Sequence, residues 1–366
     1  MSCKVGMFVM LSSVLLFSSE VDAAAARTFV ATTGSDTNTS ANCAPTAPCR
    51  TFSAALSVTA SGGEVVVLNS GGYGPTTITQ SVTITAPDGV YAGISVPAGA
   101  DGIVISGTMP SGASIDVTLR GLAINSLSQT AGGTGGRGIN IVGASTVRIV
   151  RCSIRGMPVA GVYGLADPSS TQATQLALYV QDSEFVQEPY EFYLAPNAAM
   201  GTIVASFRNV TMDGGGQYTS TARNGIYQQD GVTTSIANSQ IAGYLSGIVA
   251  LARKGAATAL VASGSVLSNG YADVAASVTS GVTVVDLRNN MLTTSSPVMG
   301  TGQGAVAVCG GAQVSLYANT ISENPAGVFF ETGCSGTSVV SSFDNNGFIG
   351  NGTDVAGGSL TSITSK

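Results

Sequence analysis

The chain repeats a six-residue unit, first as LRGLAI (119–124), then as IVRCSI (149–154) and VQDSEF (180–185). Each unit begins and ends on an apolar residue five places apart. Nine such units begin at Leu119, Ile149, Val180, Phe207, Ile236, Val261, Leu287, Leu316 and Phe343. The spacing between their first residues averages 28, and repetition at such a period is typical of a solenoid.

The inner positions of the unit predict its local shape. The third position often holds glycine, asparagine or aspartate, residues that tolerate left-handed backbone angles, so it is predicted to form a turn. The fourth position lies two residues before an apolar one, and strand alternation therefore points it inward. Three successive repeats place Asn290, Asn319 and Asn346 there, so we expect an interior ladder of amides linked by hydrogen bonds.

A second strand follows each unit, usually opened by glycine or aspartate and then an apolar residue, as in Gly161–Val162 and Asp273–Val274. Each repeat then supplies two or three short strands. With 48 glycines and few long helical periods, the sequence predicts an all-β chain, a parallel β-helix with windings of about 28 residues, rather than a helical repeat.

The stretch PCRTFSAALSVTASGGEVVVLNSGGYG precedes the repeats and predicts a short amphipathic helix followed by a buried strand. Phe52, Ala55 and Leu56 share one helical face, and Gly62 and Gly63 end the helix. In this stretch and in its repeats, over residues 27–355, the chain resembles secreted right-handed parallel β-helix proteins of the pectate-lyase-like superfamily. The resemblance implies right-handed windings, a capping helix over the first winding, and polysaccharides as ligands.

The predicted organisation has four parts. Residues 1–25 read as a signal peptide, with Lys4 before an apolar core that is too short to span a bilayer. Residues 26–63 form an N-terminal cap, 64–355 the parallel β-helix, and 356–366 a C-terminal tail. No later segment is apolar enough to span a membrane, so we expect a secreted or periplasmic protein.

The charge of the chain limits its binding partners, and its cysteines predict disulfide bonds. The formal charge is −6 and only 9% of residues are charged, which makes nucleic acid a poor partner. In an oxidising compartment, Cys43 and Cys49 are expected to pair across a short loop. Cys309 and Cys334 lie about one winding apart, so stacking brings them together as a second disulfide. No metal-ligand motif is predicted.

Histidine is absent, which removes the usual base of catalytic triads and the commonest zinc ligand. What remains is carboxylate chemistry, as in a two-carboxylate glycoside hydrolase, or a lyase that uses an arginine base with Ca²⁺ on the substrate. The densest acidic segment and the arginines near it supply the candidate catalytic residues Asp182, Glu184, Glu191 and Arg208. The structural alternative is that Asp182 serves the turn, Glu184 faces outward, and Glu191 with Glu188 solvates a loop.

Tyrosines of the second strand form another candidate site. Tyr163, Tyr193 and Tyr227 recur in consecutive repeats at an outward position, so we expect an exposed aromatic strip with the spacing of paired strands. Such a strip either stacks on sugar rings or stabilises the solenoid. Polar neighbours expected to bind the sugar are Gln228, Asp230 and Arg223.

Two functions follow and remain open. One is an exported protein that binds a polysaccharide or cell-surface glycan along its side, with or without cleavage of it. The other is a non-catalytic surface or adhesion module in which the stiff solenoid serves as a spacer or as a protein-binding face. No cofactor is predicted for binding alone, and Ca²⁺ is the cofactor that the lyase alternative would use.

Overall fold

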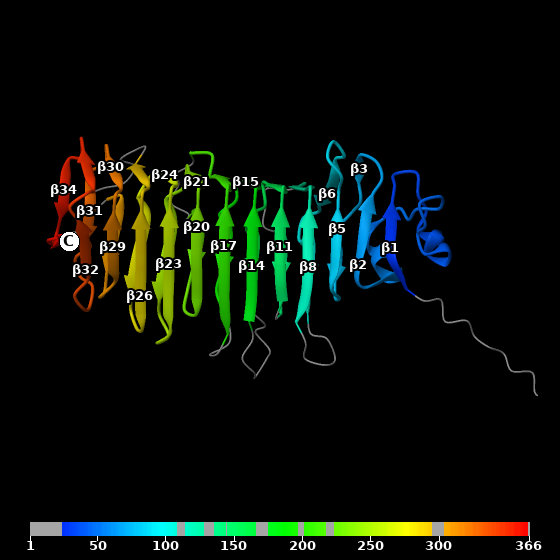
Figure 1. The fold of residues 1–366 in the computed structure, drawn as a ribbon, viewed down its shortest axis with the longest axis horizontal. Coiled ribbons are helices and arrows are strands. Elements are labelled where there is room, and N and C mark those ends of the chain that lie inside the picture. Colours follow the sequence, from blue (N-terminus) through cyan, green and yellow to red (C-terminus); the bar gives the residue numbers. More distant parts are fainter. Residues whose placement is uncertain are drawn as a thin grey trace, which may run out of the picture.

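The chain winds into three parallel β-sheets that run along one axis, as the computed structural model shows (Figure 1). The structure describes residues 24–107, 114–127, 135–143, 145–165, 175–196, 201–216, 223–294 and 304–364. Neighbouring strands in each sheet are three elements apart in the chain, so each complete winding adds one strand to each sheet. This order is that of a parallel β-helix and confirms the predicted fold class.

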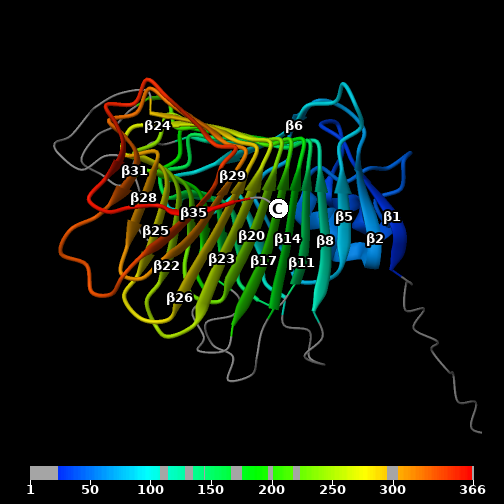
Figure 2. The ribbon, with the colours of Figure 1, turned by 60° about the vertical axis from the view of Figure 1, so that its left-hand side comes forward.

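Sheet 1 has 13 strands. They are β1 (Ala25–Val30), β2 (Thr59–Val67), β5 (Val82–Thr85), β8 (Ile115–Arg120), β11 (Ser145–Val150), β14 (Gln175–Gln181), β17 (Thr202–Arg208), β20 (Val232–Ala237), β23 (Ala257–Ser263), β26 (Val282–Arg288), β29 (Gln313–Tyr317), β32 (Val339–Phe343) and β35 (Thr361–Ile363). These strands lie side by side and point the same way from the blue end to the red end (Figure 2).

Sheets 2 and 3 have 11 strands each. Sheet 2 contains β3 (Gly71–Gly72), β6 (Ala92–Val96), β9 (Leu122–Ser126), β12 (Ser153–Arg155), β15 (Glu184–Val186), β18 (Thr211–Asp213), β21 (Gln240–Ala242), β24 (Val266–Asn269), β27 (Met291–Thr294), β30 (Thr320–Ser322) and β33 (Gly347–Ile349). Sheet 3 contains β4 (Thr76–Ile78), β7 (Ile103–Ile105), β10 (Arg137–Ile141), β13 (Ala160–Gly164), β16 (Tyr190–Leu194), β19 (Asn224–Gln228), β22 (Ser246–Ala252), β25 (Ala272–Val278), β28 (Val306–Cys309), β31 (Ala326–Phe330) and β34 (Thr353–Ala356).

The six-residue unit is the corner from sheet 1 to sheet 2. Its first and last apolar residues pair with their counterparts in the next winding, as Ile149 does with Val180 and Ile154 with Phe185. All four of these side chains are buried. The predicted turn at the third position is confirmed by left-handed backbone angles, listed by residue as Gly121 71°, Arg151 52°, Asp182 51°, Asn209 53°, Asn238 50°, Asn289 54° and Ala318 53°.

The sixth unit was predicted one residue too early. Val261 and Val266 are 41% and 42% exposed, whereas Ala262 and Leu267 are buried. The pairing of Ala262 with Leu287 places Gly264, with φ of 58°, in the turn. Because side chains alternate between faces, a slip of one residue exchanges the inner and outer sets. The true unit therefore begins at Ala262.

The ninth unit departs from the prediction in a different way. Leu316 pairs with Ser342, while Ile321 pairs with Phe348, so this winding has one extra residue between the two pairs. Ser342 thus takes the inward place expected for Phe343. The Phe343 ring instead lies beside Tyr317, with the two centroids 5.5 Å apart.

The predicted interior ladder is present and longer than expected. The Asn290 backbone N–H and side-chain amide both donate to Asn319 Oδ1, at 3.0 and 3.1 Å. The Asn319 backbone N–H and amide donate in the same way to Asn346 Oδ1, at 2.8 and 3.1 Å. Ser239 and Ser265 continue the column on the N-terminal side, because the Ser239 N–H donates to Ser265 Oγ at 3.1 Å and the Ser265 N–H donates to Asn290 Oδ1 at 3.0 Å. The windings from Ser239 to Asn346 are therefore tied to one another through polar side chains inside the solenoid.

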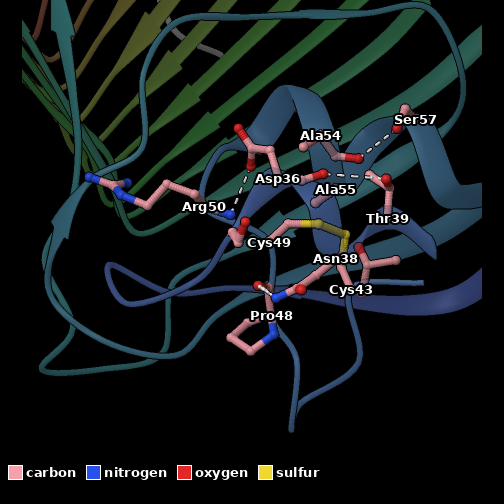
Figure 3. The surroundings of a disulfide bond; sticks show 12 residues. Asp36, Asn38, Thr39, Cys43, Pro48, Cys49, Arg50, Ala54, Ala55 and Ser57 are labelled. Carbon is pink, nitrogen blue, oxygen red and sulfur yellow. Dashed lines mark hydrogen bonds between the residues drawn. A yellow bond between two sulfur atoms is a disulfide. The ribbon is translucent and has the colours of Figure 1, made fainter. Parts of the chain in front are cut away.

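The N-terminal segment carries the helices η1 (Asp36–Ala41) and α1 (Phe52–Val58), which lie at the blue end of the stack (Figure 1). A disulfide joins Cys43 to Cys49 between them (Figure 3). The Asp36 carboxylate accepts the backbone N–H groups of Arg50 and Thr51, at 2.8 and 2.9 Å, which fixes the chain just before α1. The apolar side chains of Phe52, Ala55 and Leu56 are buried as predicted.

The solenoid extends past both predicted limits. Strand β1 pairs with β2, so sheet 1 begins at Ala25, the last residue of the predicted signal peptide, and continues through the start of the segment predicted as a cap. Strand β35 pairs with β32, so the predicted tail after residue 356 contributes a strand as well. Most of the predicted signal peptide, residues 1–23, lies outside the described residues.

Candidate functional site

The predicted tyrosine strip lies on the outer face of sheet 3. Strand pairing sets Tyr163 opposite Tyr193, and Tyr193 opposite Tyr227. The first two rings are stacked with centroids 4.7 Å apart and 8° between their planes. The second two are 5.2 Å apart at 19°. The three side chains are half-buried, so consecutive windings do form an aromatic strip there.

Neighbouring groups cover the faces of these rings. The Arg137 guanidinium lies over Tyr163, 4.3 Å from its centroid. Tyr190 packs its ring at a steep angle against both Tyr193 and Tyr227. On the far side of Tyr227, the next strand places Val249. The expected stacking of sugar rings on the strip is therefore limited, because the faces of these rings already contact other side chains.

The hydroxyls of Tyr193 and Tyr190 hold their protons more strongly than an exposed phenol does. Burial, followed by the nearby phenols of Tyr163 and Tyr227, raises the pKa of Tyr193 to about 12. Burial also raises the pKa of Tyr190. The Gln229 amide donates to the Tyr227 hydroxyl at 2.9 Å. A row of hydrogen-bonding hydroxyls thus follows the axis of the solenoid at the spacing of its strands.

The polar neighbours predicted beside the strip are placed differently. Gln228 is fully buried and its amide donates to Thr258 Oγ1 and to the Ala259 carbonyl, because alternation turns it inward next to outward Tyr227. Asp230 is 8% exposed and accepts the backbone N–H groups of Arg253 and Lys254, at 2.9 and 2.8 Å. These two predictions of direct sugar contact are wrong. Arg223 is half-buried just before β19, whose first residue, Asn224, pairs with Tyr190.

The four predicted catalytic residues do not converge. Asp182 and Glu184 line a shallow hollow of about 430 Å³ at the corner between sheets 1 and 2. Asp182 accepts from the Gln181 amide at 2.9 Å and from the Asn209 amide at 3.0 Å. Glu184 pairs with Arg155 at 2.5 Å. Arg208 is exposed at the end of β17, and Glu191 is inside the solenoid.

Glu188 and Glu191 are buried, which corrects the expectation of a solvated loop and of an accessible catalytic Glu191. The Tyr244 hydroxyl donates to Glu191 Oε1 at 2.5 Å, and the Glu188 N–H donates to the same atom at 3.4 Å. Glu188 Oε1 accepts from the Met157 N–H at 3.4 Å. The Oε2 atoms of both glutamates are buried without a hydrogen-bond partner among the described residues.

Desolvation raises the pKa of Glu191 to about 7 and that of Glu188 well above its usual range, where the Glu191 charge adds to the effect. The pair therefore holds protons that an exposed carboxylate would release. A sequence signal did exist for this placement. Glu191 occupies the same column as Gly161 and Gly225, and a Cβ on Gly161 would lie 2.9 Å from the Glu191 carbonyl and 3.4 Å from its Oε2. That column faces the interior corner, where the neighbouring glycines leave room for the glutamate.

The second disulfide joins Cys309 to Cys334, the two cysteines that stacking was expected to bring together. With Glu331, these cysteines are the only three acidic or thiol groups close enough to hold one ion in the described part of the chain. Because both sulfurs are used in the disulfide, that grouping does not act as a metal site in this state. The acidic segment from Asp182 to Glu191 forms no three-ligand cluster for Ca²⁺ within the same residues.

No helix among the described residues is long and apolar enough to cross a membrane. No protein-family model matches the chain, and no curated protein matches its sequence. Solved structures do match its fold. XylC, solved in complex with xylose, is 10% identical and superposes with a TM-score of 0.59 over 83% of this chain and 70% of its own.

Pectate lyase Pel9A is 13% identical, with a TM-score of 0.51 over 92% of this chain and 78% of its own. At such low identity the structural likeness establishes the fold alone. The activity has to be argued from the residues of the site. The three parallel sheets and these two likenesses agree with the resemblance noted in the sequence, so the chain has the right-handed parallel β-helix fold of the pectate-lyase-like proteins.

Proposed function

We propose that this protein is an exported β-helix that binds a polysaccharide along the outer face of sheet 3. The observation that carries the proposal is the strip of Tyr163, Tyr193 and Tyr227, whose rings are stacked at 4.7 and 5.2 Å and whose hydroxyls form a row. A polysaccharide lying along the solenoid axis meets one phenol hydroxyl at each winding. Rings fixed by stacking give up little entropy when those hydroxyls bind sugar hydroxyls.

Cations beside the strip support a ligand rich in oxygen. Arg253 is exposed and its charge acts on Tyr193, and the Asp230 carboxylate holds the turn that carries Arg253 and Lys254. Asp230 thus has a positioning role in place of direct contact. The likeness to XylC, solved with xylose, and to a pectate lyase supports a carbohydrate ligand for this fold. Two disulfides support export, because such bonds persist in oxidising compartments.

The decisive variant changes all three tyrosines of the strip to phenylalanine. It keeps the ring stack and removes the hydroxyls, so stability should hold while binding on a glycan array and by calorimetry falls at least about tenfold. Tyr179→Phe on sheet 1 is the matched control and should bind as the unchanged protein does. Unaltered binding by the triple variant would contradict the proposed strip. Absence of any glycan binding by the unchanged protein would favour the spacer or adhesion function.

The proposal is binding without cleavage. Its support is the separation of the candidate groups, since Glu191 is buried, Arg208 lies on sheet 1, and Asp182 with Glu184 occupies the corner hollow. A panel of neutral and acidic polysaccharides should therefore release no reducing or unsaturated ends, with or without a chelator. Product release that Asp182→Asn abolishes would overturn this part of the proposal.

A further inference from the structure

A second hollow lies on the outer face of sheet 1, over strands β26, β29 and β32. It measures about 320 Å³ and is lined by Asp286, Arg288, Ser315, Tyr317 and Phe343. Strand pairing sets Asp286 beside Ser315 and Arg288 beside Tyr317. The hollow therefore belongs to a different sheet from the tyrosine strip and shares no residue with it.

The extra residue of the last windings creates this hollow. Ser342 takes the inward place, because it pairs with the buried Leu316. Its hydroxyl accepts a hydrogen bond from the side-chain amide of Asn346 at 3.1 Å. Alternation then aims Phe343 outward against Tyr317, with 75° between the ring planes. Irregular residues of this kind in sheets redirect side chains and often occur at binding sites.

The ring of Tyr317 is less covered by neighbouring side chains than the rings of the strip tyrosines are. It is 45% exposed, and Phe343 is the one aromatic ring that contacts it among the described residues. No guanidinium lies over its ring within the same residues. Tyr179 offers a useful contrast on the same face of sheet 1. It is 43% exposed, but the Arg148 guanidinium lies over its ring, 5.4 Å from the centroid.

The polar side of the hollow is fixed and close to neutral. Arg288 Nε donates to both carboxylate oxygens of Asp286, at 3.0 and 2.9 Å, and its Nη2 also contacts that carboxylate. The N–H groups of Arg288 that remain, the other lone pairs of Asp286 and the Ser315 hydroxyl can each bind a ligand hydroxyl. Because the charges of Asp286 and Arg288 cancel, the hollow has no free cation to offset the desolvation of an anionic sugar, so a neutral ring is favoured.

We propose that this hollow is a second carbohydrate-binding site, specific for a neutral sugar ring. The ring's apolar face stacks on Tyr317, Phe343 forms the wall, and the Asp286–Arg288 pair with Ser315 binds its hydroxyl groups. Pockets that combine an aromatic surface with a few fixed polar groups are typical of small-ligand sites. This inference is independent of the polysaccharide proposed for sheet 3.

The test uses ligand-observed NMR and calorimetry with neutral xylo- and cello-oligosaccharides and with oligogalacturonate. It compares Tyr317→Ala with Tyr179→Ala, each alone and in the triple phenylalanine variant of the strip. We expect neutral oligosaccharides to bind the triple variant, and Tyr317→Ala to weaken that binding about tenfold. Tyr179→Ala should leave the affinity for neutral oligosaccharides unchanged. Oligogalacturonate should not bind to the triple variant.

Three results would overturn the proposal: no neutral binding by the triple variant, equal binding by Tyr317→Ala, or equal losses for Tyr317→Ala and Tyr179→Ala. Should the triple variant not fold, Tyr317→Ala in the otherwise unchanged protein serves instead. Saturation transfer from the Tyr317 and Phe343 rings to a neutral oligosaccharide must then disappear in that variant. Saturation transfer that persists in Tyr317→Ala would also overturn the proposal.

Discussion

Tyrosines on two faces of the same solenoid are used in opposite ways. On sheet 3, Tyr163, Tyr193 and Tyr227 stack on one another, and Arg137 and Val249 cover the ends of the row. On sheet 1, Tyr317 meets Phe343 at a steep angle beside an ion pair. A regular column lets identical side chains stabilise each other, whereas a local irregularity leaves one ring free for a ligand. The contrast predicts that the ring stack of the strip contributes to stability while its hydroxyls bind a ligand, whereas the ring of Tyr317 contributes mainly to affinity.

The largest expected effect concerns the carboxylates beneath the strip. The pKa of Glu191 is about 7 in the folded protein, against an ordinary 4.5 in the unfolded chain, with desolvation as the first cause. Its contribution to stability is therefore complete below about pH 4.5 and is lost as the pH rises through 7, a change of about 3 kcal/mol. Glu191→Gln keeps an acceptor for Tyr244 and should flatten this slope in denaturant unfolding.

Glu184→Gln is the control for that measurement, because it removes a carboxylate from β15, the strand before β16, where the side chain is not buried. The slope that Glu191 gives to the unfolding free energy should persist in this variant. A Glu191→Gln profile as steep as that of the unchanged protein would contradict the buried, protonated pair.

The next effect compares the two tyrosine environments directly. Tyr193→Ala removes three ring contacts and should cost about 2 to 4 kcal/mol of unfolding free energy. Tyr317→Ala removes one ring contact and should cost about 1 kcal/mol or less. Urea unfolding of both variants at one pH measures the difference. Similar losses would remove the distinction between a stabilising strip and a ligand-binding ring.

A smaller effect is expected for the wall of the hollow. Phe343→Ala leaves Tyr317 in place and removes one side of the site, so neutral oligosaccharide affinity should fall about threefold. Binding on sheet 3 should be unaffected, since no residue is shared between the two sites. Calorimetric titration with a neutral oligosaccharide provides the measurement, and a loss on both faces would indicate a global change of structure.

The smallest expected effect is that of salt. Because Asp286 and Arg288 neutralise each other, neutral sugar affinity at the hollow should change less than about twofold between about 0.05 and 0.5 M salt. Binding beside Arg253 and Lys254 on sheet 3 should weaken with salt whenever the ligand carries negative charge. Equal and strong salt dependence on both faces would contradict a neutral site on sheet 1.

The sequence predicts those parts of the fold that repeat. A column repeated in each winding identified the left-handed turns at Asp182 and Asn209, the Asn290–Asn319–Asn346 ladder, and the neighbouring tyrosines. The repeat predicts the wrong inward residue where a winding contains an extra residue or where the unit is displaced by one position. Val261 was assigned to the interior because valine suits either face of a strand, and pairing with Leu287 instead selects Ala262.

The candidate site was less predictable, because its chemistry depends on direction and on what covers each group. Glutamates are rarely buried, so composition favoured a solvated loop for Glu188 and Glu191. Their burial depends on glycines in adjacent windings and on Tyr244, more than fifty residues away. The hollow beside Tyr317 was not predicted either, since it depends on an extra residue whose effect appears only after strands are paired.

The interior ladder has a consequence for how such a molecule changes over evolutionary time. The junctions at Ser265, Asn290 and Asn319 present the same groups, because in each of them a backbone N–H donates to the Oδ1 of an asparagine in the next winding. A complete turn can accordingly be duplicated or deleted in the gene while the cut ends still match in register and polarity. Length is thus a freely adjustable property of this protein, and the surfaces along its sides can be moved apart or together without redesigning the interior.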